Sequence, residues 1–143
     1  PFKDFTLTRF DTGAPLTLSS LRGKVVLVNF WFPTCGPCMN EFPYIQQALD
    51  KYKSQGFEIL AINIVPDEDK DVLQTVKDKQ VTFTTLKMSD DEFAAREYRV
   101  AGAPTNFLLG RDGRVEFQPA IHDRETARTF ERQIEMLLKR SGT

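Results

Sequence analysis

Residues 25–43 read VVLVNFWFPTCGPCMNEFP and contain both cysteines of the chain, Cys35 and Cys38. An apolar run rich in β-branched and aromatic side chains ends at Pro33, which is typical of a strand buried on both faces. After the cysteines, apolar residues recur at helical spacing from Phe42 to Tyr52. The cysteine pair is therefore expected at the junction between a strand and a helix.

This position matters for the chemistry of the first cysteine. The first N–H groups of a helix have no partner within it, and the helix dipole is positive at this end. Both effects stabilise a thiolate, which is the form of cysteine that attacks a disulfide. The C-x-x-C spacing at this position indicates a site of thiol-disulfide exchange.

The length and charge of the chain exclude several classes of protein. Its 143 residues suit a single domain, residues 1–143, with a core large enough to fold without stabilising disulfide bonds. With 19 basic and 20 acidic residues the net charge is -1, so we expect no nucleic-acid binding and no membrane contact by the domain itself. Two cysteines are too few for a disulfide-stapled scaffold, which favours a catalytic role.

The chain carries no targeting segment. No apolar run approaches the roughly 20 residues that span a bilayer, and no signal peptide is present. Because the chain begins with Pro1 and not Met, we expect that a signal, an anchor or another domain preceded it.

Strand and helix patterns alternate along the chain. Alternating apolar residues around a turn at 11–13 predict an N-terminal β-hairpin over residues 2–18. Apolar runs predict further strands, and helical periodicity with capping residues predicts helices. The expected strands are 24–32, 57–65, 83–88, 103–109 and 115–117, and the expected helices are 35–54, 67–79, 89–98 and 127–140. This order predicts an α/β domain with a central mixed sheet flanked by helices.

Several short motifs within this order resemble the thioredoxin fold. They are Cys35-Gly36-Pro37-Cys38, Pro43 inside the following helix, and Ala103-Pro104-Thr105 before a late strand. A C-x-x-C alone is a weak signal because zinc sites also use it. Here the motifs occur together, in the family's order, over nearly the whole chain.

Other residues are more similar to the extracytoplasmic TlpA/ResA subfamily, which is related to the AhpC/TSA and Redoxin proteins, than to cytosolic thioredoxin. They are the N-terminal hairpin, Leu21-Arg22-Gly23-Lys24, Glu41-Phe42-Pro43 and the segment from Arg99 to Thr105. The resemblance implies a thioredoxin fold with an N-terminal β-hairpin extension and a thiol-disulfide oxidoreductase activity.

The resemblance also implies roles for individual residues. Cys35 is expected to be the exposed nucleophile and Cys38 the shielded resolving thiol, with Pro104 a cis-proline packed beside them. From the sequence alone, an X-Pro bond is cis in only about one case in twenty. The backbone of Ala103 could then pair with a substrate strand. The expected substrate-binding residues are Thr34, Gly36, Pro37, Ala103 and Pro104.

Cys38 needs a proton acceptor when it attacks the mixed disulfide. Thioredoxin itself is expected to place a buried aspartate on the central strand for this task, whereas this chain has Asn29, whose amide cannot accept the proton. Glu41 lies three residues after Cys38 on the same helical face. Spacing alone favours a solvated glutamate in the first helical turn, whereas the resemblance favours Glu41 as the proton relay.

Further residues near the cysteines carry expectations of their own. Thr34 stands where the family usually has a tryptophan directly before the first cysteine, which leaves the shape of the substrate-contact surface open. Trp31 remains, and we expect it to pack under the site. Pro43 is expected to kink the helix. The dipeptide Gly36-Pro37 matches reducing thioredoxins and weakly favours a reductase over an oxidase.

Two alternative functions would use the same cysteines. A peroxiredoxin-like peroxidase needs proline at position 28 and threonine at position 32, where this chain has Val28 and Phe32. A Cu(I)- or zinc-binding metallochaperone needs further ligands, but His122 is the only imidazole and no second cysteine pair exists. We therefore expect no metal site, and we interpret the acidic run at 67–71 as a solvated helix start.

The sequence thus predicts a thioredoxin-fold oxidoreductase that reduces protein disulfides with its own Cys35-Cys38 pair and needs no other cofactor. Its expected partners are protein disulfide or dithiol substrates and an upstream thiol electron donor. We expect a monomer that works in an extracytoplasmic space, with the cytoplasm as the alternative, and contributes to cell redox homeostasis.

Overall fold

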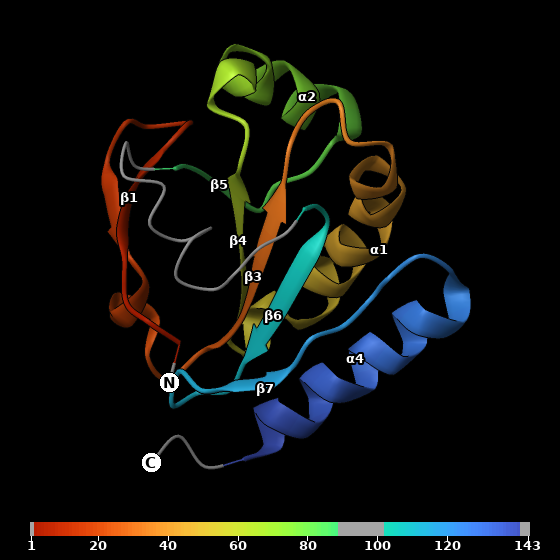
Figure 1. Ribbon diagram of the computed structural model, residues 1–143. Helices are drawn as coiled ribbons and strands as arrows, with labels where there is room; N and C mark the ends of the chain where they lie inside the picture. Colours follow the sequence, from red (N-terminus) through yellow and green to blue (C-terminus); the bar gives the residue numbers. More distant parts are fainter. Residues whose placement is uncertain (1, 89–101, 141–143) are drawn as a thin grey trace.

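The computed structural model of the chain describes residues 2–88 and 102–140. Seven strands form one mixed sheet in the order β2-β1-β5-β4-β3-β6-β7 (Figure 1). The strands are β1 (Thr6–Arg9), β2 (Pro15–Thr17), β3 (Val25–Trp31), β4 (Phe57–Asn63), β5 (Thr84–Lys87), β6 (Thr105–Leu109) and β7 (Val115–Phe117). The α-helices are α1 (Gly36–Tyr52), α2 (Val72–Lys79) and α4 (Arg124–Lys139), and the 3-10 helices are η1 (Leu18–Leu21), η2 (Lys53–Gln55) and η3 (Pro66–Asp71).

Strand β3 lies inside the sheet, parallel to its neighbour β4 and antiparallel to its neighbour β6. All seven of its residues are buried, as the apolar run predicts. Val28 and Phe30 lie in an apolar cluster with the N-terminal segment, whereas Leu27 and Trp31 lie in a second cluster with α1 and α4. Because side chains alternate along a strand, Asn29 points to the face of the sheet that α1 covers.

The predicted N-terminal hairpin is confirmed and becomes one edge of the sheet. Strands β1 and β2 pair antiparallel, and β1 also pairs antiparallel with β5. Strands β3, β4 and β5 are parallel, while β6 and β7 form the predicted antiparallel hairpin at the other edge. The expected mixed α/β sheet with a hairpin extension is therefore confirmed.

Helices α1 and α4 cover the same face of the sheet (Figure 1). Their contact includes a hydrogen bond from the Tyr52 hydroxyl to Glu135 Oε2 (2.5 Å) and an ion pair between Lys51 and Glu131 (3.0 Å). The apolar stripe predicted for the last helix is buried, at Ala127, Phe130, Ile134 and Leu137. Within residues 2–88 and 102–140, no helix combines the length and the apolar character that crossing a bilayer requires.

The helix expected at 67–79 is shorter than predicted. Its first turns are the 3-10 helix η3, and α2 begins only at Val72. The spacing of Val72, Leu73 and Val76 predicts one buried apolar face for this helix. Val72 is buried, but Leu73 is 53% exposed. Adjacent helical residues point about 100° apart, and only one side of this two-turn helix is covered. The helix predicted over 89–98 lies outside the described residues.

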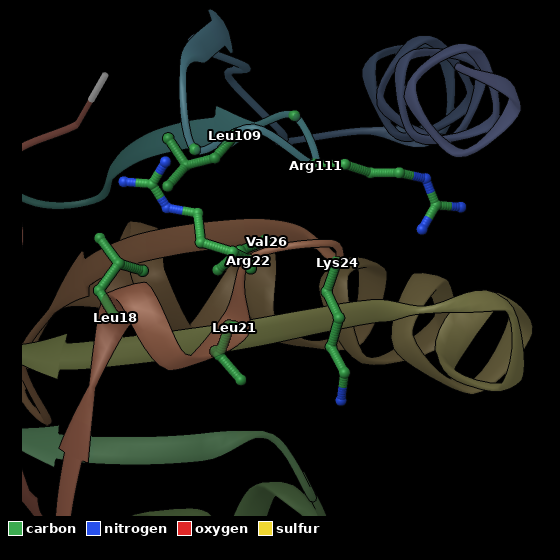
Figure 2. Close-up of a pocket in the computed structure, with 9 residues that line it drawn as sticks. Leu18, Leu21, Arg22, Lys24, Val26, Leu109 and Arg111 are labelled. Atoms are coloured by element: carbon green, nitrogen blue, oxygen red, sulfur yellow. The ribbon is translucent and has the colours of Figure 1, made fainter. Parts of the chain in front are cut away.

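The end of the sheet at the start of β3 is held by two arginines. Arg22 Nη1 donates to the carbonyl oxygen of Asp112 (2.5 Å), and Arg111 donates to the carbonyl oxygens of Gly23 (2.6 Å) and Leu138 (2.8 Å). Figure 2 shows these side chains around a cavity of about 10 Å³, which has room for about one water molecule. The apolar part of its lining is Leu18, Leu21, Val26 and Leu109. The cysteines follow the opposite end of β3.

Phe130 of α4 gives a direct test of this packing, because it is fully buried and its ring centroid lies 6.2 Å from that of Phe57. We expect Phe130→Ala to lower the free energy of unfolding by about 3–5 kcal/mol in urea denaturation. The control Leu73→Ala removes an exposed side chain and should change it by no more than about 0.5 kcal/mol. Equal effects of the two substitutions would contradict the position of α4.

Candidate active site

Cys35 and Cys38 are joined by a disulfide at the start of α1, with their Cα atoms 5.2 Å apart. Cys35 is the N-cap residue of the helix, and its Sγ accepts a hydrogen bond from the backbone N–H of Cys38 (3.1 Å). The position predicted from the sequence, between a buried strand and a helix, is thus confirmed. A sulfur at this point receives both a backbone donor and the positive end of the helix dipole.

The expectation that Cys35 is exposed is wrong for this disulfide form. Only 3% of Cys35 is accessible, and Cys38 is fully buried. The reason is that the Cys35 sulfur turns back to cap the helix and joins the apolar cluster beneath it. Thr34, Gly36 and Pro37, which we expected to contact substrate, are exposed around the disulfide. A partner must therefore approach the sulfur across these residues.

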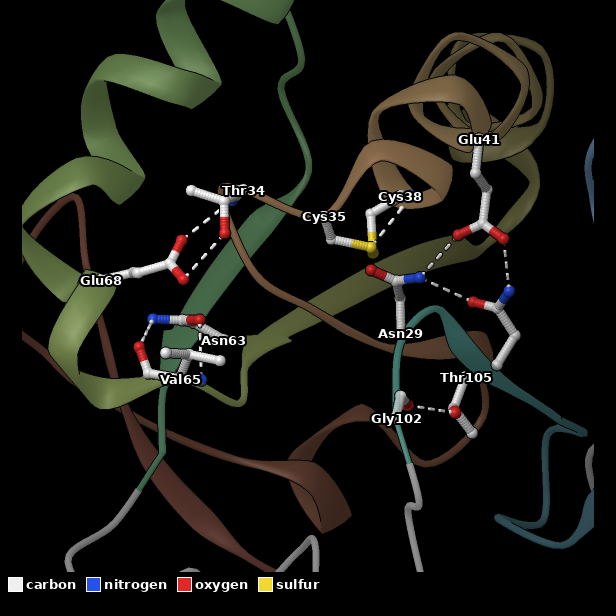
Figure 3. Close-up of a disulfide and its surroundings, with 11 residues drawn as sticks. Asn29, Thr34, Cys35, Cys38, Glu41, Asn63, Val65, Glu68, Gly102 and Thr105 are labelled. Carbon is white, nitrogen blue, oxygen red and sulfur yellow. Dashed lines mark hydrogen bonds between the residues drawn. A yellow bond between two sulfur atoms is a disulfide. The ribbon is translucent and has the colours of Figure 1, made fainter.

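Glu41 is fully buried, so the solvated glutamate that spacing alone favoured is wrong. Its Oε1 accepts a hydrogen bond from Asn29 Nδ2 (2.8 Å), and its Oε2 accepts one from Asn106 Nδ2 (2.7 Å). Figure 3 shows Glu41 and Asn29 reaching toward each other from α1 and β3, next to the disulfide. The two amides give the carboxyl group the partners that a buried polar group needs.

Burial dominates the electrostatics of Glu41. It raises the pKa of this carboxyl from 4.5 to about 7, although the hydrogen bonds from Asn106 and Asn29 act in the opposite direction. A carboxyl group with this pKa exists in both protonation states near neutral pH. It can therefore accept a proton and release it again, which is the property required of a general base.

Asn106 is the residue of this cluster that the sequence analysis missed. It is the second residue of β6, 5% exposed, and lies two positions after Pro104. Its Oδ1 accepts from Asn29 Nδ2 (2.8 Å), which closes a triangle of side chains from β3, α1 and β6. The signal was present in the sequence as an amide at the start of an otherwise apolar strand, where a polar side chain needs a partner.

The loop before β6 lies next to this cluster. The Ala103-Pro104 peptide is cis, as the resemblance implied, and Thr105 Oγ1 donates to the carbonyl oxygen of Gly102 (2.6 Å). Ala103 and Pro104 are half-buried. A cavity of about 300 Å³ lies between this loop, the start of α1 and the segment 118–122, and its lining includes Pro37, Glu41, Pro104, Asn106 and His122. The cavity thus joins predicted substrate contacts to the buried carboxyl.

The segment before Cys35 is held by an acidic residue that we had interpreted as solvated. Glu68 of η3 accepts two hydrogen bonds from Thr34, one from its backbone N–H (2.8 Å) and one from Oγ1 (2.9 Å) (Figure 3). Asp69 is also engaged, since it accepts from Asn63 Nδ2 (2.7 Å). The interpretation of 67–71 as a solvated helix start is therefore wrong at these two positions.

The two remaining residues predicted near the site are Trp31 and Pro43. Trp31 is fully buried, and its ring centroid lies 5.1 Å from that of Phe42 on α1, so it packs under the site as expected. Pro43 lies inside α1 and is exposed.

Comparison with known proteins agrees with this geometry. A protein-family model, the AhpC/TSA family, matches residues 1–118. The chain belongs to this family. It is 38% identical over 104 residues to the thiol-disulfide oxidoreductase ResA of Bacillus subtilis (strain 168), a match of 72% of this chain and 56% of ResA. It is 35% identical over 135 residues to ResA of Geobacillus kaustophilus (strain HTA426), a match of 94% of this chain and 74% of that protein.

A solved structure is also similar to this chain. The crystal structure of a Chlorobium tepidum protein described as the thiol:disulfide interchange protein DsbE shares 33% sequence identity with a TM-score of 0.85, over 96% of this chain and 94% of that one. These relatives favour thiol-disulfide exchange over the peroxidase and metallochaperone alternatives. Within the part of the chain that the structure describes, no three His, Cys, Asp or Glu side chains are grouped so that they could hold a metal ion.

The raised pKa of Glu41 predicts how stability depends on pH. Between about pH 4.5 and pH 7 the unfolded chain has lost the Glu41 proton while the folded protein keeps it, so stability falls as the pH rises through this range. The full loss should be about 3 kcal/mol. Glu41→Gln lacks this group, and we expect its stability relative to wild type to increase by this amount from pH 4 to pH 8 in urea denaturation. The control is Glu125→Gln, an exposed residue of α4. Parallel curves for wild type and Glu41→Gln would contradict the prediction.

The contact between Glu68 and Thr34 gives a second prediction. We expect Glu68→Ala to lower the free energy of unfolding by about 1 kcal/mol, because two hydrogen bonds to a partly exposed carboxylate are lost. Asp67→Ala is the matched control, since Asp67 is exposed on the same turn and makes no side-chain hydrogen bond among the described residues. It should change stability by less than about 0.5 kcal/mol. If both variants have the same stability, Glu68 does not hold this segment.

Proposed function

We propose that this chain is a thiol-disulfide oxidoreductase that reduces disulfides of protein substrates. The observation that carries the proposal is the buried Glu41 carboxyl, with a pKa of about 7, beside a disulfide at a helix N-terminus. A disulfide that only staples the fold needs no titratable group next to it. An exchange site needs one, because a thiol must lose its proton before it attacks.

The proposed cycle begins with the reduced pair. The Cys35 thiolate attacks one sulfur of a substrate disulfide, so that a Cys35-substrate disulfide forms and the other substrate sulfur leaves as a thiolate. The Cys38 thiol then gives its proton to Glu41 and attacks the Cys35 sulfur. The Cys35-Cys38 bond forms, the bond to substrate breaks, and the second substrate sulfur leaves. Two electrons have then passed to the substrate.

Glu41 is suited to the second step by its environment. It accepts two amide hydrogen bonds that fix its orientation, and it lines the cavity that reaches the surface near Pro37 and Pro104. A proton taken from Cys38 can leave through this cavity once the disulfide has formed. The geometry therefore supports Glu41 as the proton relay that Asn29 cannot be.

Substrate would bind across the exposed rim of the disulfide. Thr34, Gly36 and Pro37 are exposed on one side of it, and the half-buried pair Ala103 and Pro104 lies on the other side of the cavity. An extended segment of substrate could pair with the backbone at Ala103, because Pro104 has no N–H and cannot compete. Thr34 is a small residue held by Glu68, so it offers no ring for a substrate to stack on.

The chemistry and the relatives support a proposal for the partners and the location. Each turnover leaves the pair oxidised, so an upstream dithiol protein must return two electrons to it. Similarity to ResA and DsbE proteins supports our proposal that the chain works outside the cytoplasm.

The roles of the two cysteines can be separated with a model protein disulfide such as insulin. We expect Cys38→Ser to form a stable mixed disulfide with it through Cys35, because the resolving thiol is absent. Cys35→Ser should form none, since the buried Cys38 cannot reach a substrate. Non-reducing gels and intact mass measure the adduct. The opposite pattern, or an adduct on both variants, would overturn the assignment of nucleophile and resolving thiol.

Glu41→Gln tests the relay. We expect resolution of the mixed disulfide to slow by about 100-fold near neutral pH, which is typical of the loss of a general base. The attack of Cys35 on substrate should be little changed. Rapid-mixing kinetics of the two steps would give this result, and equal slowing of both steps would argue against a relay to Cys38.

A further inference from the structure

Asn29 carries a buried polar atom that lacks a hydrogen-bond partner among the described residues. Asn29 is fully buried, and its Nδ2 donates both of its hydrogens, one to Glu41 Oε1 and one to Asn106 Oδ1, each at 2.8 Å. Its Oδ1 receives no hydrogen bond within the described residues. An acceptor that is removed from water and left unpaired costs free energy, so its presence beside a reactive disulfide calls for an explanation.

The orientation of this amide is fixed by its neighbours. Asn106 Nδ2 donates to the backbone carbonyl oxygen of Pro119 (3.2 Å) as well as to Glu41 Oε2 (2.7 Å). Turning the Asn106 amide over would place its oxygen against two acceptors, so Asn106 Oδ1 must face Asn29. Asn29 Nδ2 must then face Asn106 and Glu41, and its oxygen points the other way.

The free oxygen lies on the side of the disulfide. Figure 3 shows Asn29 below the cysteines, with its side-chain oxygen directed toward the sulfur and its nitrogen directed toward Glu41. Neither sulfur of a disulfide carries a hydrogen, so no donor is available to Asn29 Oδ1 from the cysteines in this form. The cysteines provide a donor only when the disulfide is reduced.

We propose that Asn29 Oδ1 is the acceptor for the Cys38 thiol in the reduced protein. Reduction by a dithiol transfers two electrons and two protons to the pair. The Cys35-Cys38 bond breaks, the reductant becomes a disulfide, and Cys38 gains an S–H group. This S–H donates to Asn29 Oδ1, while Asn29 Nδ2 continues to donate to Glu41. The inference rests on the thiol-disulfide exchange proposed above and assigns Asn29 as a positioning residue within it.

This arrangement has two consequences. The reduced form gains a hydrogen bond that the disulfide form lacks, so Asn29 shifts the equilibrium toward the dithiol. The Cys38 thiol is also held next to the amide that contacts Glu41. A carboxylate at position 29 could accept the same hydrogen bond, but it would place a second negative charge beside Glu41, which like-charge repulsion disfavours.

Infrared spectroscopy of a protein with one thiol tests the hydrogen bond directly. Cys35→Ser leaves Cys38 as the only thiol of the chain, so its S–H stretching band is unambiguous. We expect this band to move to higher frequency when Asn29→Ala is added, because the acceptor is lost. Asn63→Ala is the matched control, since it removes a buried amide of the neighbouring strand β4 whose hydrogen bonds go to Val65 and Asp69 and leaves the partners of Asn29 in place. An S–H band that Asn29→Ala leaves unchanged overturns the proposal.

If the Asn29 variants do not fold, the Cys35→Ser protein alone tests the hydrogen bond. In that case the S–H band of folded Cys35→Ser is compared with that of the urea-unfolded chain. We expect the lower frequency in the folded protein, and a frequency equal to or above that of the unfolded chain contradicts the assignment. Neither infrared comparison requires turnover, so both test the hydrogen bond even if the chain fails to reduce protein disulfides.

The equilibrium with glutathione supplies a second measurement. We expect Asn29→Leu, which conserves volume, to shift the dithiol-disulfide equilibrium constant about tenfold toward the disulfide, equivalent to about 30 mV. Asn63→Ala, which removes a buried amide outside this cluster, should remain within about threefold of wild type. An unchanged constant in Asn29→Leu, or a shift toward the dithiol, overturns the proposal.

Discussion

The burial of one carboxyl group, that of Glu41, is the constraint on which the rest of the site depends. A carboxylate removed from water must find hydrogen-bond donors or take up a proton. In this protein it does both in part, because two asparagine amides donate to it and burial still raises its pKa to about 7. Hydrogen bonds from the amides reduce the free-energy cost of burying the charged carboxylate. The cost that remains raises the pKa, so the group can change its protonation state. The result is a proton acceptor matched to a thiol at neutral pH.

The fold brings this cluster together from three distant segments. Asn29 comes from the centre of β3, Glu41 from the second turn of α1, and Asn106 from the start of β6. The antiparallel pairing of β3 and β6 places Asn29 and Asn106 directly opposite each other, on the face that α1 covers. Rigid elements therefore hold all three side chains, while the parts that meet a partner, around Thr34 and Pro104, are loops. This division keeps the reacting groups on rigid elements and leaves recognition of the partner to the loops.

The features that could be predicted from the sequence are those that a local sequence pattern determines. The β3 run, the helical stripe of α4 and the C-x-x-C at the helix start each follow from the spacing of apolar and special residues. The burial of Glu41 could not follow from spacing, because it depends on Asn106, which is 65 residues away. Glu68 was misjudged for the same reason, since its partner Thr34 lies 34 residues earlier. Leu73 was misplaced because a two-turn helix has too few residues for its covered side to be read from periodicity.

The most direct measurement is the pKa of Glu41 itself in the oxidised protein. The side-chain carboxyl carbon can be labelled with ¹³C and followed by NMR across pH, with the resonance assigned by its absence in Glu41→Gln. We predict a midpoint near 7. A midpoint near the ordinary value of 4.5 would mean that the carboxyl is solvated in solution, and it would then be unable to serve the cysteines as described.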